Sequence, residues 1–398
     1  MTFDDVHAQS HLIAANVLEP APWHHHLLEQ CPLHRETAHE PPFYVVSRHA
    51  DVLAMVTEPD LWNNGDGSGV FYQPGGVLGG SDGDDHRRQR RVLQDGFRPK
   101  AIEDLAPKID AIGLQLWDEA FADDGEGDFV DLFAFSFPAI VIAELLGVSA
   151  ANRHQFGAWS SDIVNGLGGG DLRLVDAATS GIFAMVNELV AERRGQLAAG
   201  AEPPDDVITV LTKATADGTL SDDELRRLCV QLLVAGHETT ASLIGMMLYR
   251  LIQHPHLVAA LRDDMSLIPA AVEEFLRYES PVQGLFRTNA QACELLGEPM
   301  AKRTKVQVLF AAANRDPRVW DEPDEIRFDR PSGRPHLALG WGIHHCIGAP
   351  LARREGQLSL RLLVERFDRV ELTGDVAVNE PFILRGLRSM PIRWTVRR

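Results

Sequence analysis

One stretch of this chain, from Leu220 to about His254, constrains the fold more than any other, because it predicts a single very long helix. Ser221 and Glu224 have the spacing of a capping box, which marks a first helical turn. At 1.5 Å per residue, such a helix would span roughly 50 Å. Its apolar residues, as in Leu232–Val234, fall on nearly all sides, and a helix without a polar face is buried. The rest of the chain therefore has to pack around it.

Other segments also show helical periodicity, and only short ones resemble strands. The predicted helices are Leu105–Phe121, Phe135–Leu146 and Ile182–Leu197. The predicted strands are Phe43–Ser47, Lys305–Phe310 and Ile392–Val396. No stretch has the composition of a linker. We therefore expect one mainly α domain over residues 1–398, with minor β structure in a small strand-rich lobe.

Charge and hydropathy limit the partners. The formal net charge of −19 argues against nucleic acid, whose phosphates need basic patches. No run reaches the roughly 18 apolar residues of a membrane-spanning helix. The segment Met1–His11 is polar and acidic, unlike a signal peptide or an anchor. We expect a cytoplasmic protein that binds neither nucleic acid nor a membrane.

The four cysteines are Cys31, Cys229, Cys293 and Cys346, and they lie far apart with no C-x-x-C pair. This spacing excludes a disulfide scaffold and the usual zinc patterns. At most one or two of these thiols should carry chemistry.

Glycines surround one of these cysteines. Gly340, Gly342 and Gly348 let a loop fold tightly around Cys346, so that backbone N–H groups can point at its sulfur. The pattern after Cys346 becomes helical, which places the sulfur near a helix N-terminus, where negative charge is stabilised. The sequence therefore indicates a thiolate that binds a metal.

Two other interpretations of Cys346 are weaker. A cysteine is often a small buried apolar residue, but the glycine spacing argues against that here. A zinc site built from His344, His345 and Cys346 would need adjacent residues to converge on one tetrahedral ion.

The centre of the long helix contains residues that are poor helix formers. Gly236 allows the close approach of a flat body, and the Thr239 hydroxyl can compete for backbone carbonyls and open the turn. A carboxylate, Glu238, beside this hydroxyl in a buried helix is a plausible proton relay. The alternative is a surface glutamate next to a helix-bending threonine.

Glu274 and Arg277 stand at i, i+3 on a predicted helix, within reach of an internal ion pair. Such a pair is more often found on the surface. The later segment Asn314–Pro317, followed by Trp320–Arg330, offers a charged partner on a meandering loop.

These motifs occur in the order seen in the cytochromes P450, and the chain resembles the soluble bacterial members from about Asp82 to its C-terminus. The resemblance implies the cytochrome P450 fold and a haem-thiolate monooxygenase that hydroxylates, or otherwise oxidises, a small hydrophobic substrate with dioxygen. It implies that Cys346 is the thiolate ligand of haem b. Glu238 and Thr239 match the family's acid and alcohol pair. Glu274, Arg277 and Arg330 match its structural network.

The resemblance also implies residues around the cofactor and the substrate. The expected cofactor-binding residues are His86, Arg90, Arg287, His344, Gly340, Gly348 and Ala235. The expected substrate-binding residues are Val70, Phe71, Tyr72, Val234, Val282, Leu285, Phe286, Ile383 and Leu384. The substrate set is almost entirely apolar, which suits a hydrophobic ligand.

Electrons must come from another protein, because the chain has no flavin signature and no cysteine cluster for an iron–sulfur centre. We expect a monomer that receives electrons from a ferredoxin-type donor with its NAD(P)H-dependent reductase. A local basic surface could attract an acidic donor. Its residues would be Arg87, Arg88, Arg91, Arg98, Lys100, Arg353 and Arg354.

Two other functions remain open at this point. A peroxide-driven oxygenase would need no acid and alcohol pair, so Glu238 and Thr239 favour dioxygen. A haem-thiolate binding protein without turnover would need neither this pair nor an apolar pocket.

Overall fold

The structure is a computed structural model that describes residues 17–149, 153–167, 172–331, 335–379 and 383–398. The segment Met1–His11 lies outside the described residues. Helices dominate and strands are short, so the prediction of a mainly α fold with minor β structure is confirmed. Residues cluster into two compact units. The first comprises Met1–Gly83, Pro269–Cys346 and Val378–Gly386, and the second Asp84–Ile268, Ile347–Ala377 and Leu387–Arg398.

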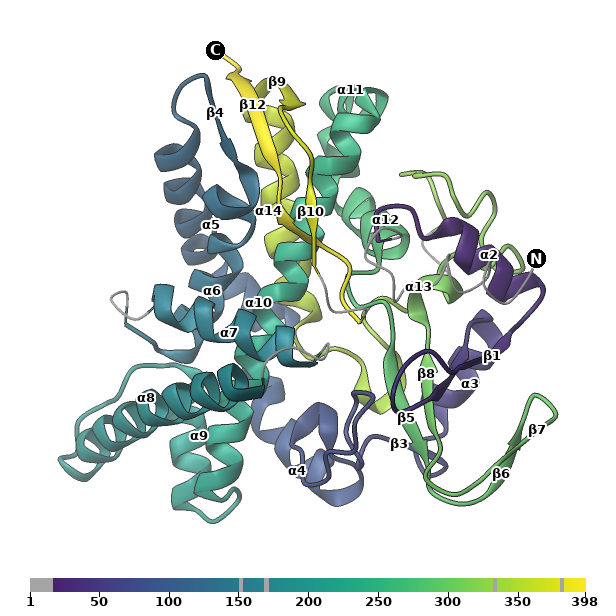
Figure 1. Ribbon diagram of the computed structural model, residues 1–398. Helices are drawn as coiled ribbons and strands as arrows, with labels where there is room; N and C mark the ends of the chain where they lie inside the picture. The colour runs from purple at the N-terminus through teal and green to yellow at the C-terminus, as the bar shows by residue number, and fades with distance from the viewer. Residues whose placement is uncertain (1–16, 150–152, 168–171, 332–334, 380–382) are drawn as a thin grey trace. The chain divides into compact units, whose positions relative to one another are not determined.

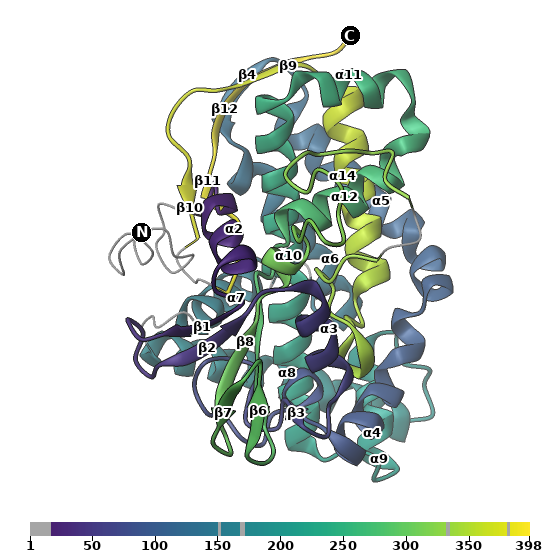
Figure 2. The ribbon, with the colours of Figure 1, turned by 90° about the vertical axis from the view of Figure 1, so that its right-hand side faces the viewer.

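The first unit contains the larger sheet, with strand order β1-β2-β8-β5-β3 (Figure 1). These strands are β1 Leu33–Glu36, β2 Phe43–Val46, β3 Trp62–Asn63, β5 Leu285–Asn289 and β8 Lys305–Val308. β2 pairs in parallel with β8, whereas β5 pairs with β8 in antiparallel register. The hairpin of β6 Cys293–Leu295 and β7 Glu298–Met300 extends beyond the ends of β5 and β8 (Figures 1 and 2).

Short helices make up the rest of this unit. They are α2 Ala21–Glu29, α3 His49–Thr57, α12 Ile268–Glu279, α13 Phe310–Ala313, and the 3-10 turns η2 Leu78–Gly80 and η7 Gly342–His344. The core of the unit joins Val46 and Val308 of the sheet to Val52 of α3 and Phe310 of α13. The predicted strand Lys305–Phe310 ends at Val308, because the alanines that follow favour a helix.

The second unit is a helical bundle around α10 Asp222–Gln253, which is 32 residues long. Its other helices are α4 Gly83–Gln94, α5 Pro99–Phe121, α6 Ser136–Leu146, α7 Arg153–Leu167, α8 Leu172–Ala198, α9 Val207–Ala216, α11 Pro255–Asp263 and α14 Ala349–Arg366, with short turns η3 Asp95–Phe97, η4 Val130–Ala134 and η6 Met265–Leu267. Both hydrogen bonds of the predicted Ser221–Glu224 capping box are present. α10 packs against α6, α7 and α14 (Figure 2), which explains why it has no polar face.

A three-stranded sheet, β4-β12-β9, completes this unit. It comprises β4 Gly125–Asp128, β9 Phe367–Leu372 and β12 Pro391–Val396, and a separate two-stranded sheet pairs β10 Ala377–Val378 with β11 Leu387–Ser389. An aromatic cluster packs against the three-stranded sheet. Trp117 and Phe121 of α5 contact Phe367 of β9, with ring centroids 4.8 and 5.2 Å apart. Such contacts fix this sheet against α5.

One helical segment, Arg173–Ala198 of α8, is long and apolar enough to cross a membrane by length and composition alone. In this structure α8 packs against α7, α9 and α10.

Candidate active site

The loop before Cys346 is held by its backbone. The Cys346 N–H donates to the Leu339 carbonyl at 2.8 Å. Gly340 and Gly342 have φ of 68° and 69°, a region that side chains disfavour. A Cβ at Gly342 would also lie 2.7 Å from the carbonyl oxygen of Val56 in α3. These two glycines are therefore required by the turn that presents the half-buried Cys346.

Gly348 has a different role. It is the N-cap of α14, and its φ of −81° is one that any residue adopts. Cys346 precedes this N-cap by two residues in the sequence, which agrees with the prediction that a helix begins just after Cys346. The negative charge of a thiolate is favourable there.

Arg287 on β5 is a buried cation, 4% exposed. Its guanidinium donates to the Phe286 carbonyl at 3.1 Å, and it forms no ion pair with any carboxylate among the described residues. Burial lowers the pKa of Arg287 to about 10, against the opposing influence of Asp82. A buried charge without a counter-ion is costly, so this site is suited to an anionic group such as a haem propionate.

His344 is also in the first unit, where its Nε2 lies 3.0 Å from Asp82 Oδ1. This carboxylate also accepts a hydrogen bond from the Asn64 backbone N–H at 2.7 Å. His344 is thus anchored by a protein carboxylate, an interaction that the sequence did not suggest.

In the second unit, His86 and Arg90 lie four residues apart on α4 and share one helical face, as expected. His86 is 2% exposed and Arg90 is half-buried. Between them, Arg88 donates to Glu224 of the α10 capping box at 2.6 Å, so it helps to hold α4 on α10.

The predicted basic surface is largely neutralised. Most of its cations are paired with carboxylates within the protein, which reduces the positive field available to attract an acidic partner. The pairs are Arg87–Asp84, Arg88–Glu224, Arg98–Asp95, Lys100–Asp104 and Arg354–Asp110.

At the centre of α10, Glu238 is 7% exposed and accepts a hydrogen bond from Ser161 of α7, with 2.6 Å between Oγ and Oε1. Burial raises the pKa of Glu238, and the Ser161 hydroxyl opposes this shift. The Thr239 hydroxyl donates to the Ala235 carbonyl at 2.8 Å. Because the hydroxyl hydrogen is used in this bond, the Thr239 oxygen remains able to accept a hydrogen bond from another group. The Ala235 side chain is exposed.

Two neighbours on this turn face the bundle. A Cβ at Gly236 would lie 3.0 Å from the Ile142 side chain of α6, so the small size of Gly236 serves a helix–helix contact. The interpretation of Gly236 as the point where a flat body approaches α10 was therefore wrong. His237 is fully buried, with Nε2 3.0 Å from the Phe135 carbonyl oxygen.

His237 should make stability depend on pH. Burial lowers its pKa from 6.5 to about 4, so the unfolded chain binds a proton that the folded protein resists. The stability that neutral His237 contributes is fully present above pH 6.5 and is lost as the pH falls towards 4. Over this interval, the free energy of unfolding should fall by on the order of 3 kcal/mol more in the wild type than in His237→Gln. Urea unfolding measures this, and equal losses in both proteins would contradict the assignment.

The predicted ion pair between Glu274 and Arg277 is present and buried, with the two side chains 4% and 1% exposed. Two guanidinium nitrogens of Arg277 donate to the two carboxylate oxygens, each at 2.7 Å. Arg330 Nε donates to the same carboxylate at 2.9 and 3.0 Å. The remaining donors of Arg277 bind the backbone carbonyls of Asn314, Pro323 and Glu325. The surface interpretation of this pair is therefore excluded.

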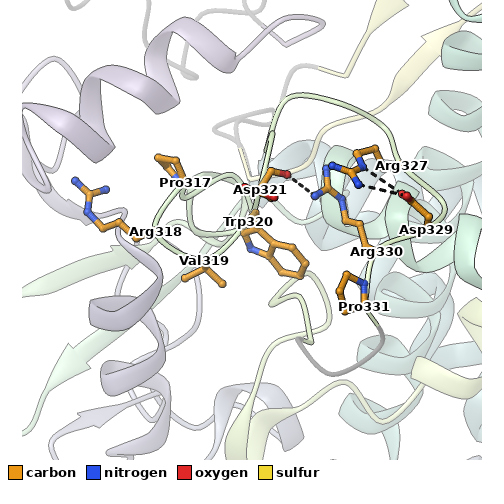
Figure 3. Close-up of a pocket in the computed structure, with 9 residues that line it drawn as sticks. All are labelled: Pro317, Arg318, Val319, Trp320, Asp321, Arg327, Asp329, Arg330 and Pro331. Carbon is orange, nitrogen blue, oxygen red and sulfur yellow. Dashed lines mark hydrogen bonds and ion pairs between the residues drawn. The ribbon is translucent and has the colours of Figure 1, made fainter.

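A pocket of about 690 Å³ lies on the loop that this network supports (Figure 3). It is lined by Pro317, Arg318, Val319, Trp320, Asp321, Arg327, Asp329, Arg330 and Pro331. Its arginines are engaged within the protein: Arg330 with the Asp321 carbonyl at 2.5 Å, and Arg327 with Asp329 at 3.2 Å (Figure 3). None of the predicted substrate residues lines this pocket.

Several predicted substrate residues of the first unit do lie together. Val282 forms a β-bridge with Leu384, and the Ile383 carbonyl accepts a bond from the Gln283 N–H at 2.9 Å. The Phe286 N–H donates to the Ser68 carbonyl at 2.9 Å, which brings the loop of Val70 to β5. Val234, on α10, belongs to the second unit.

Two of the expected substrate-binding residues, Phe286 and Tyr72, contact other parts of the first unit. Phe286 is fully buried with its ring 5.0 Å from that of Phe43. Because strand residues alternate between faces, Phe286 points away from the face that Leu285 and Arg287 share, so Phe286 is removed from the predicted lining. Tyr72 is 45% exposed, and its hydroxyl donates to the Arg303 carbonyl.

Phe71, next to Tyr72, is 43% exposed, and its ring lies 6.3 Å from that of His39. Val70 is buried. The side chains of this loop thus point in different directions, and the sequence could not distinguish them.

Two residues near α10 were missed by the sequence analysis. Ser161 holds Glu238, as described above. Glu355 of α14 is fully buried, and burial raises its pKa well above the usual range. No local pattern marks either residue, because a serine or a glutamate on a helix is ordinarily exposed.

Comparisons with known proteins agree with this arrangement. A family model described as Cytochrome P450 matches residues 139–391. The chain is 39% identical over 321 residues to cytochrome P450 107B1 of Saccharopolyspora erythraea, covering 79% of this chain and 76% of that protein. It is 35% identical over 360 residues to erythromycin C-12 hydroxylase of the same organism, covering 87% and 88%. The solved structure of CalO2 matches with a TM-score of 0.87 and 31% identity, covering 97% of this chain and 98% of that one.

Proposed function

This chain belongs to the cytochrome P450 family and is a P450 monooxygenase, and on that premise we propose that it hydroxylates a hydrophobic, polyketide-derived small molecule. The observation that carries the oxygenase chemistry is the glycine turn that presents Cys346, because it makes this thiol suitable as a metal ligand. We take residues 1–398 as one functional domain.

The residues fit a haem b group. Cys346 would bind the iron through its thiolate, and Arg287, His344, His86 and Arg90 would interact with the propionates. Gly340, Gly348 and Ala235 would allow the close approach of the ring. When bound, this group supplies the activation of dioxygen by two electrons.

Arg287 gives a test of cofactor retention. Replacing Arg287 with Gln removes the buried cation, so haem should transfer to apomyoglobin about ten- to a hundredfold faster, the effect of one charge-assisted hydrogen bond. Arg303→Gln is the matched control, because Arg303 belongs to the same unit but is 53% exposed and paired with Asp66. Equal transfer rates in the two variants would contradict a propionate role for Arg287.

Glu238 and Thr239 are proposed to supply protons during dioxygen activation. Two features of α10 support this role: the buried Glu238 carboxyl has a raised pKa, and the Thr239 hydroxyl oxygen can accept a hydrogen bond. This acid and alcohol pair favours dioxygen over peroxide as the oxidant, since peroxide already carries its protons.

Thr239→Ala should uncouple electron use from product formation. The product formed per NADH oxidised is expected to fall at least about tenfold, with hydrogen peroxide released instead, because one member of the relay is missing. Thr240→Ala, one residue further along the helix, is the control. Unchanged coupling in Thr239→Ala would remove Thr239 from the relay.

The substrate class is supported by the similarity to erythromycin C-12 hydroxylase and by the apolar side chains of Val282, Leu285 and Leu384. Absorption spectra of the ferric protein during titration with macrolactones, fatty acids and terpenes would test it. A low-spin to high-spin change with a macrolactone is expected. A change with fatty acids or terpenes alone would overturn the polyketide assignment, and the absence of bound haem after reconstitution would overturn the function itself.

The electron donor is proposed to be a ferredoxin with its NAD(P)H-dependent reductase, and the protein to act as a soluble, cytoplasmic monomer. Because most of the predicted basic surface is ion-paired, we expect the docking rate to depend only weakly on salt.

A further inference from the structure

Ser161 is on α7, a helix that packs against α10, and it precedes Glu238 by 77 residues in the sequence. Its hydroxyl donates to Glu238 Oε1 at 2.6 Å, a distance typical of a strong hydrogen bond to a carboxyl group. No other hydrogen bond to the Glu238 side chain is found among the described residues. A single hydroxyl therefore orients this buried carboxyl group.

The hydrogen bond from Ser161 determines which oxygen of Glu238 can carry a proton. Oε1 is occupied as an acceptor, so a proton carried by Glu238 resides on Oε2. The neighbouring groups do not compete for it. The His237 ring is directed to the Phe135 carbonyl, and the Thr239 hydroxyl donates to the Ala235 carbonyl. Burial raises the pKa of Glu238, and among the described residues the Ser161 hydroxyl opposes this shift.

We infer that Ser161 is the positioning residue of the proton relay: it holds Oε1 of Glu238 so that Oε2 alone carries and releases the proton. This inference rests on the proposed role of Glu238. Protons that leave Oε2 are replaced from solvent, so no other reactant is needed.

The neighbouring serine supplies a matched control. Ser160 is fully buried, and its hydroxyl has no hydrogen-bond partner among the described residues. Ser160→Ala and Ser161→Ala thus remove the same atom from adjacent positions of α7, but only Ser161→Ala removes a bond to Glu238. Ser161→Thr keeps the hydroxyl and should rescue the effect.

Infrared difference spectroscopy of the haem-loaded protein between about pH 5 and about pH 9 tests the inference directly, since a protonated carboxyl has a C=O band that a carboxylate lacks. Glu238→Gln identifies the band by deleting it. A hydrogen bond to Oε1 weakens this C=O bond. In Ser161→Ala the band should therefore shift to higher frequency, and its pH midpoint should rise because the carboxylate loses a donor. Ser161→Thr and Ser160→Ala should match the wild type.

An unshifted band in Ser161→Ala would overturn the inference, as would the absence of any band that Glu238→Gln deletes. Turnover tests the proposed function separately. If Glu238→Gln retains wild-type product per NADH while the band shifts in Ser161→Ala, Ser161 positions Glu238 but Glu238 is not the proton donor. If Glu238→Gln uncouples turnover and the band does not shift, the relay stands and only Ser161 is excluded.

Discussion

Replacing Cys346 with serine should abolish the thiolate-haem absorption spectrum completely. The turn held by the Cys346 N–H and the Leu339 carbonyl would remain, because it depends on the backbone and not on the sulfur. A serine hydroxyl stays protonated where a thiol is readily deprotonated, so it cannot replace an anionic sulfur ligand. The spectrum of the reduced, carbon-monoxide-treated protein measures this loss.

Cys293→Ser is the control for this experiment. Cys293 is also half-buried and lies in the same unit, on β6, where its sulfur accepts a hydrogen bond from the Asn289 side chain. This variant should keep the full thiolate spectrum. Survival of that spectrum in Cys346→Ser would transfer the ligand assignment to another cysteine.

Replacing Arg277 with Met should cost about 3–5 kcal/mol of the free energy of unfolding, the usual result of breaking a buried ion pair. Glu274, which is 4% exposed, would lose one of its two guanidinium partners among the described residues, and Arg330 would remain to balance its charge. The backbone carbonyls of Asn314 and Pro323 would lose their Arg277 donor as well, whereas that of Glu325 would keep Arg330. Urea unfolding of the haem-loaded protein gives the comparison.

Arg361→Ala serves as the reference for an exposed pair. Arg361 and Glu365 form an i, i+4 pair on α14 with side chains 49% and 43% exposed. Its removal should cost no more than about 1 kcal/mol. If Arg277→Met cost as little, the network behind the cysteine loop would contribute no more to stability than a surface contact.

Much of the fold was predictable because the signals are local. The capping box at Ser221 and the apolar pattern that follows it specify α10 over a few turns of chain. The run of aromatic and β-branched residues from Phe43 to Val46 located β2 to within one residue. The glycines before Cys346 marked a turn, because only a residue without a side chain adopts the φ of Gly340 and Gly342 readily.

The site was predictable only in part. Glu274 and Arg277 could be paired from their spacing, but their burial depends on the loop from Asn314 to Arg330, which folds over them. The ion pairing of the predicted basic surface could not be foreseen for a similar reason, namely that it depends on residues distant in the sequence. Its carboxylate partners include Glu224 and Asp110, more than a hundred residues away from the arginines that they bind.

By itself, then, the sequence determined the helical frame and the cysteine loop, since each depends on residues within a few positions of one another. It also determined the class of enzyme, because four such local motifs occur along the chain in the order seen in the cytochromes P450. Tertiary structure alone decided that Ser161 orients Glu238, that Phe286 faces Phe43, and that Arg287 is buried without a carboxylate partner among the described residues. The physical reason is that hydrogen bonds, ion pairs and desolvation depend on distances in space, and segments far apart in the chain acquire those distances only when it folds.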